Sequence, residues 1–112
     1  MATTLPPAEA LTLDSLVTTT ERGIASRVLA KTAAGNITLF AFDAGEELSE
    51  HTAPFDALVL TLSGAFTLTI GGQEVRATPQ TIVRMPATIP HAVRASEPAR
   101  MLLIMLRAPG TM

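Results

Sequence analysis

The side chains best suited to chemistry in this chain are its two histidines, His51 and His91. Imidazole binds divalent metals when neutral, and it exchanges a proton near physiological pH. Cysteine is absent, so thiolate ligands and disulfides are excluded. Two imidazoles can hold a divalent metal, whereas a tight site usually has three or four protein ligands. The histidines therefore predict either a weak metal site or a metal-free pocket.

The first histidine lies in a stretch bounded by two glycines. His51 follows Gly45 by six positions, and Gly64 closes the stretch after Ala53 and Ala57. This spacing resembles the first sequence motif of the cupin family of small β-barrels. In that motif the positions of Ala53 and Ala57 hold a second histidine and a glutamate.

The second histidine lies in a stretch that resembles the second cupin motif. Pro86 and His91 match that motif in type and spacing. Gln80 and Thr88 stand where the motif has glycine, and Ala95 stands where it has asparagine. The similarity extends over most of residues 24–107.

The resemblance implies an all-β fold, the double-stranded β-helix or jelly-roll barrel. It also implies a site in which three imidazoles and a carboxylate surround one divalent ion. This chain keeps His51 and His91 as metal ligands, so any bound ion (zinc, nickel, iron, manganese or copper) would be completed by water or ligand. The pocket would be lined by Ala53, Ala57, Val59, Thr61 and Met85.

Asp56 offers an alternative third ligand, because it neighbours the position of the missing glutamate. A bulge after Pro54 would turn Asp56 inward. His51, Asp56 and His91 would then resemble the two-histidine, one-carboxylate set of non-haem iron enzymes. The other interpretation is that Asp56 caps a local turn or pairs with an arginine at the barrel rim.

Length and turn signals predict one domain with eight or nine strands. We expect an N-terminal arm over 1–23 with a short strand or turn, a barrel over 24–107 and a tail over 108–112. Gly71 and Gly72 predict a tight hairpin turn. Glu46, Glu47 and Glu50 are expected in a solvated loop. The expected strands are 24–31, 36–44, 57–63, 65–70, 73–77, 81–85, 91–95 and 99–106.

Alternation predicts that one strand has two apolar faces. Ala57, Val59 and Thr61 share one face of this strand. The alternating residues Leu58, Leu60 and Leu62 share the other face. A monomer rarely exposes such a surface to water. We therefore expect a homodimer.

Three functions of different classes are compatible with these residues. The first is a barrel that binds an apolar or aromatic small molecule, with or without a metal. The second is a metal-dependent oxygenase or isomerase that uses His51, His91 and Asp56. The third is a regulatory sensor that acts through another chain. The net charge of −2 argues against nucleic-acid and membrane partners, and no signal peptide is evident, which predicts a cytoplasmic protein.

Overall fold

Nine short strands make up most of residues 4–107, the part of the chain that the computed structural model describes. Eight of them lie within two residues of the expected segments. Gly71 and Gly72 have φ values of +57° and +84° and form the predicted two-residue turn between two of these strands. The strands are β1 (Ile24–Thr32), β2 (Gly35–Phe42), β3 (Glu47–His51), β4 (Asp56–Ser63), β5 (Phe66–Ile70), β6 (Gln73–Ala77), β7 (Ile82–Met85), β8 (His91–Ala95) and β9 (Ala99–Leu106).

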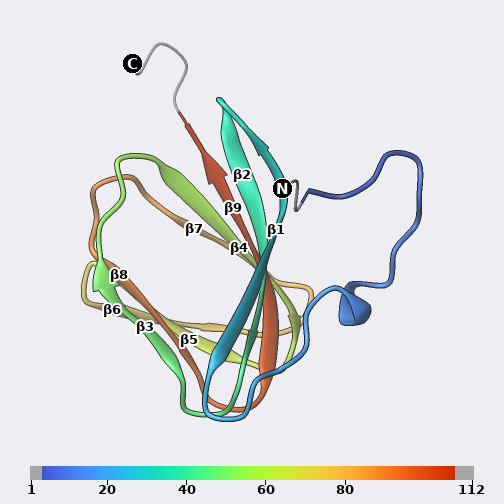
Figure 1. Cartoon of the computed structure of the whole chain (residues 1–112). Helices are drawn as coiled ribbons and strands as arrows, with labels where there is room; N and C mark the ends of the chain where they lie inside the picture. Colours follow the sequence, from blue (N-terminus) through green and yellow to red (C-terminus); the bar gives the residue numbers. More distant parts are fainter. Residues whose placement is uncertain (1–3, 108–112) are drawn as a thin grey trace.

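Two antiparallel sheets face each other and form the barrel (Figure 1). The five-stranded sheet has the order β1-β2-β9-β4-β7, and the four-stranded sheet has the order β3-β8-β5-β6. Strands far apart in the sequence are neighbours in both sheets, as the jelly-roll fold requires. The all-β barrel expected from the sequence is confirmed. Within residues 4–107, no helix is long and apolar enough to cross a membrane.

The core lies between the two sheets. Ala57, Val59 and Thr61 are buried on the inner face of β4, as the alternation predicts. Phe42 of the five-stranded sheet and Phe66 of the four-stranded sheet meet edge to face, with ring centroids 5.1 Å apart. This geometry is favourable for aromatic pairs and adds to their area burial. The aromatic pair and the aliphatic side chains around it hold the two sheets together.

The acidic segment differs from its expected loop conformation, because Glu47 and Glu50 belong to β3. Its side chains are mostly exposed, while the backbone pairs with β8. Pairing with β8 gives the backbone N–H and C=O groups hydrogen-bond partners even where the side chains stay in water. A run of polar residues is therefore a poor indicator of a loop.

The N-terminal segment contains a 3-10 turn, Leu13–Ser15, which decides between the turn and the strand left open by the sequence. Leu5 N donates a hydrogen bond to the Leu29 carbonyl of β1. The guanidinium of Arg100 in β9 donates to the Val17 carbonyl at 2.8 Å. The expected tail, 108–112, lies outside the described residues.

Left-handed backbone occurs at all four positions where the two motifs carry glycine. Gly45 and Gly64 have φ values of +83° and +70°. Gln80 and Thr88 have φ values of +68° and +67°, although neither is glycine. A Cβ at Gly64 would lie 2.3 Å from the Pro98 carbonyl oxygen, so that position also needs glycine for space. The motif glycines thus mark turns, and this chain keeps two of those turns with strained residues.

We expect Thr88→Gly to stabilise the protein by up to about 1 kcal/mol. A β-branched residue in the left-handed region is strained by about 1–2 kcal/mol, and the greater freedom of glycine in the unfolded chain offsets part of that gain. Urea unfolding measures the change. Thr52→Gly is the matched control, because Thr52 is an exposed loop threonine without positive φ, and it should be neutral or destabilising. A loss of stability in Thr88→Gly would contradict the strain.

Candidate functional site

The pairing of β3 with β8 brings the two histidines together. His51 ends β3, His91 begins β8, and the two residues are direct cross-strand partners. Their Nε2 atoms lie 3.2 Å apart. The ring centroids are 4.4 Å apart at an interplanar angle of 73°. The structure thus places side by side the two histidines that the sequence analysis assigned to one site.

A β-bulge decides which way His51 points. Leu48 pairs with Val93, and the next paired residues are His51 and His91, so β3 uses three residues where β8 uses two. In a regular strand, Glu50 would have shared the face of Leu48. The extra residue instead turns His51 to that face. The bulge therefore puts an imidazole where a carboxylate would otherwise lie.

Backbone carbonyls hold both imidazoles by their other nitrogen. His51 Nδ1 lies 2.7 Å from the Ser49 carbonyl oxygen, and His91 Nδ1 lies 3.3 Å from the Ile89 carbonyl oxygen. A carbonyl oxygen only accepts, so each Nδ1 carries the proton in the neutral ring. Both Nε2 atoms then present lone pairs to each other. This arrangement favours a proton or a metal ion shared between them.

The two imidazoles differ in solvent exposure. His91 is 4% exposed, whereas His51 is exposed to solvent. Burial lowers the pKa of His91 below its usual 6.5, and the neighbouring charge of His51 lowers it further. The hydrogen bond to the Ile89 carbonyl opposes these effects. His91 consequently stays neutral, and able to bind a metal, to a lower pH than an ordinary histidine.

Asp56 does not join the histidines. Its carboxylate accepts hydrogen bonds from Ala87 N at 2.8 Å and from Arg84 Nε at 2.9 Å. The bond from Ala87 and then that from Arg84 lower the pKa of Asp56. No cluster of three or more potential metal ligands of the His, Cys, Asp and Glu types occurs in the described part of the chain. Asp56 instead ties β4 to the connection that leads into His91, which is the rim-pairing alternative left open by the sequence.

The remaining pocket candidates lie in two environments. Ala53 is half-buried in the connection between β3 and β4, and its carbonyl accepts a hydrogen bond from Thr88 N at 2.8 Å. Ala57, Val59, Thr61 and Met85 are at most 3% exposed and face the barrel interior. The Thr61 hydroxyl is buried there without a hydrogen-bond partner. The barrel interior at these four positions is therefore apolar except for the Thr61 hydroxyl.

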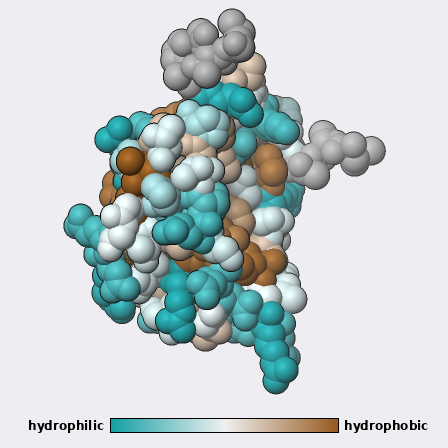
Figure 2. Space-filling view, turned by 90° about the vertical axis from the view of Figure 1, so that its left-hand side faces the viewer, coloured by the Kyte–Doolittle hydropathy of each residue, from teal (hydrophilic) through white to brown (hydrophobic). Residues whose placement is uncertain are grey.

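Figure 2 shows the side of the molecule from which the β3–β4 and β7–β8 connections project in Figure 1. Apolar areas on this side are broken up by polar residues. The β3–β4 connection follows His51, and the β7–β8 connection precedes His91.

The carbonyls of Ser49 and Ile89 are functional groups that sequence reasoning did not find. They belong to the backbone, so residue type gives no sign of them. Their positions follow from the bulge in β3 and from the turn before β8. Each lies two residues before its histidine, which is the one regularity that a sequence search could use.

Metal-free protein should lose stability as the pH falls from about 7 towards 5. Folding lowers the pKa of His91 below 6.5. Below pH 6.5 this histidine is therefore protonated in the unfolded chain while it is still neutral in the folded chain. The free energy of unfolding decreases over this range and levels off once the pH is below the folded pKa. The lowered pKa values of Asp43 and Asp56 start from 3.8, so those carboxyls act at more acid pH. Urea unfolding in a chelator at each pH measures the trend. His91→Gln should flatten it, and an equally steep trend in that variant would assign the effect elsewhere.

Comparison with known proteins places these features in one family. The sequence profile of the cupin domain family matches residues 38–105. A conserved protein of unknown function from Streptococcus pyogenes is 34% identical, with 95% of this chain and 93% of that chain covered and a TM-score of 0.88. A cupin superfamily protein from Desulfitobacterium hafniense is 33% identical, with coverages of 93% and 95% and a TM-score of 0.85.

More distant structures share the fold alone. A salicylate 1,2-dioxygenase variant from Pseudoaminobacter salicylatoxidans is 12% identical, with 74% of this chain and 26% of that chain covered and a TM-score of 0.69. A search of the curated proteins found no match. The profile match over more than half of the sequence, the two full-length structural relatives and the barrel itself agree, and this chain belongs to the cupin family.

Proposed function

We propose that this cupin is a small-molecule binding module whose barrel carries a weak, two-histidine metal site. The observation that supports it most directly is the 3.2 Å separation of the Nε2 atoms of His51 and His91. Zinc–nitrogen bonds of about 2.0–2.1 Å at a tetrahedral angle place two nitrogens about 3.3 Å apart. The pair thus has the spacing of two ligands on one ion.

The donor set fits a loosely held ion better than a tightly held one. Ala53 and Ala57 offer no ligand atom where other cupins have a histidine and a glutamate, so the chain supplies two nitrogens from His51 and His91. Water or a bound molecule would fill the remaining positions. A divalent ion held in this way would supply Lewis acidity to a ligand oxygen or nitrogen. The carbonyls of Ser49 and Ile89 would fix the tautomer of each imidazole. The apolar side chains of the barrel interior would exclude water from the ion.

The interior chemistry favours an apolar or aromatic guest. Ala57, Val59 and Met85 present hydrocarbon and thioether surface on the inner side of the five-stranded sheet. We expect a guest in the barrel interior to contact these apolar side chains and to place its polar end at the two Nε2 atoms. A pocket with an apolar wall and a few convergent polar groups is typical of small-molecule sites.

The alternative is a metal enzyme of the oxygenase or isomerase type that uses His51, His91 and Asp56. The third ligand of such an enzyme would be Asp56, but the carboxylate of Asp56 accepts hydrogen bonds from Arg84 and Ala87 N instead. The binding module therefore accounts for more of the observed contacts than the enzyme does. Metal titration distinguishes the two, since only the enzyme needs Asp56 at the ion.

Zinc or nickel should bind to the chelator-treated protein and should perturb the ring-nitrogen NMR signals of both histidines. We expect His51→Ala and His91→Ala each to lower the affinity by more than about tenfold, because each removes one of two protein ligands. Binding should also weaken as the pH falls below about 6.5, since imidazole must be neutral to ligate. Isothermal titration calorimetry of the metal ion measures both effects.

Two variants serve as controls for that titration. Glu50→Ala removes an exposed carboxylate next to His51 and should leave the affinity unchanged. Asp56→Ala should also leave it unchanged, whereas a loss as large as that of His51→Ala would restore the enzyme alternative. Absence of metal binding by the unaltered protein would leave a metal-free binding barrel and would refute the metal site.

A further inference from the structure

Two methionines flank the position where other cupins carry their carboxylate ligand. Ala57 of β4 pairs with Met85 of β7 on one side and with Met105 of β9 on the other. Directly paired residues of an antiparallel sheet project to the same face of that sheet. Because Ala57 faces the barrel interior, both methionine side chains also lie on the inner face. The position of the missing carboxylate thus has a thioether on either side.

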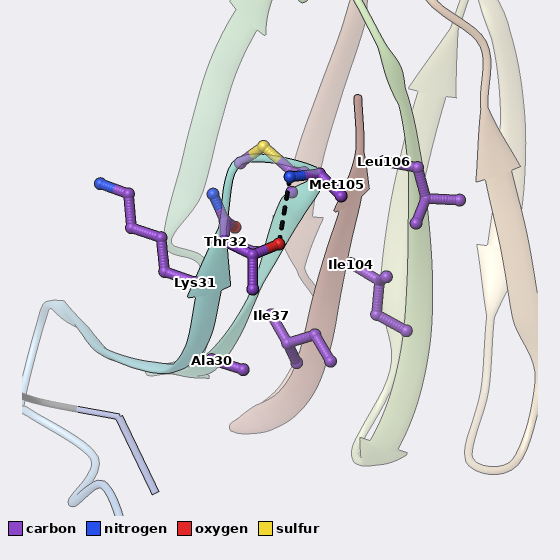
Figure 3. Close-up of a pocket in the computed structure, with 10 residues that line it drawn as sticks. Ala30, Lys31, Thr32, Ile37, Ile104, Met105 and Leu106 are labelled. Atoms are coloured by element: carbon purple, nitrogen blue, oxygen red, sulfur yellow. Dashed lines mark hydrogen bonds between the residues drawn. The ribbon is translucent and has the colours of Figure 1, made fainter. Parts of the chain in front are cut away.

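The surroundings of each methionine agree with this register. Met85 is 1% exposed and belongs to the same core cluster as Ala57. Met105 is half-buried and packs against that cluster. In the close-up of Figure 3, the Met105 side chain extends away from those of Ile104 and Leu106, which lie on the opposite face of β9. Both thioethers therefore belong to the inner wall of the barrel.

The two histidines lie at the same end of the barrel as these methionines. A short connection joins His51 to the start of β4, and another joins Met85 to His91. Strand β9 also ends here, because Leu106 pairs with Asp56, the first residue of β4. A methionine side chain is unbranched and has three rotatable bonds, so its sulfur can adjust toward an ion at the two Nε2 atoms.

The donors at this end of the barrel are soft and uncharged. Neutral imidazole suits copper and zinc alike, whereas thioether sulfur favours the softer copper(I). The carboxylate of Asp56 is held by Arg84 and Ala87 N, outside this donor set. Burial of an ion without a counter-charge costs free energy, and that cost is smaller for a monovalent ion than for a divalent one. A neutral donor set with two sulfurs therefore favours copper(I) over zinc(II).

We propose that the site takes copper(I) through four protein ligands, which are two imidazoles and two thioethers: His51, His91, Met85 and Met105. The proposal rests on the two-histidine site proposed above and names its ion. Met101 of β9 also faces inward, but it pairs with Thr61, farther along β4 than Ala57, and it is fully buried in the core. Met101 is therefore outside the donor set and provides a matched control.

Competition with the chelator bicinchoninate under anaerobic reducing conditions measures the copper(I) affinity of the unaltered protein and its variants. Leucine conserves the volume and the apolar character of methionine. Met85→Leu and Met105→Leu should each weaken copper(I) binding by about tenfold or more, because each removes one of the protein ligands. Zinc affinity should stay within about twofold of the unaltered protein, since thioethers are not among the usual zinc ligands. Met101→Leu should change neither affinity.

The methionine methyl groups give a second readout in the unaltered protein. With isotope-labelled methyl groups, added copper(I) should shift the NMR signals of Met85 and Met105 and leave the Met101 signal in place. The leucine variants assign these signals, because each variant lacks one of them.

The outcomes separate the copper(I) assignment from the metal site on which it rests. Copper(I) affinity that is indifferent to Met85→Leu and Met105→Leu, or an equal loss of zinc affinity in these variants, would overturn the thioether ligation. So would methyl signals of Met85 and Met105 that do not move. If zinc binding then still depends on both histidines, the two-histidine site stands and only its assignment to copper(I) is wrong. If neither ion binds to the unaltered protein, both proposals are wrong.

Discussion

The bulge in β3 is the constraint on which the histidine site depends. Side chains alternate along a strand, so one extra residue reverses the side on which every later residue lies. Between Leu48 and His51 that reversal puts the imidazole on the inner face beside His91 and leaves Glu50 in solvent. The same irregular segment presents the Ser49 carbonyl to His51 Nδ1. One backbone irregularity therefore sets both the position and the protonated nitrogen of this side chain.

The connection before β8 fixes the second histidine in a comparable way. Asp56 binds Ala87 N, Thr88 N binds the Ala53 carbonyl, and the Ile89 carbonyl meets His91 Nδ1. These hydrogen bonds hold a short loop whose Thr88 is in a left-handed conformation. Asp56 consequently supports the site from outside it. Its low pKa reflects this structural role and does not indicate metal ligation.

The five-stranded sheet explains why so small a barrel is apolar on two sides. Its inner face packs against the four-stranded sheet through residues such as Val59 and Met101, which are fully buried. Its outer face also carries hydrocarbon side chains, of which Leu39 is fully buried while Ile82 is exposed.

The sequence by itself determined the strand and turn rhythm, the Gly71–Gly72 hairpin and the inward face of β4, because these depend on local backbone preference and alternation. It also located the histidines through their spacing. Tertiary structure decided that the acidic segment forms β3, that its bulge aims His51, and that Asp56 meets Arg84. Each of these depends on pairing with a distant strand. The physical reason is that local residues set which conformations are accessible, whereas a partner strand selects the register and hence the face on which each side chain lies.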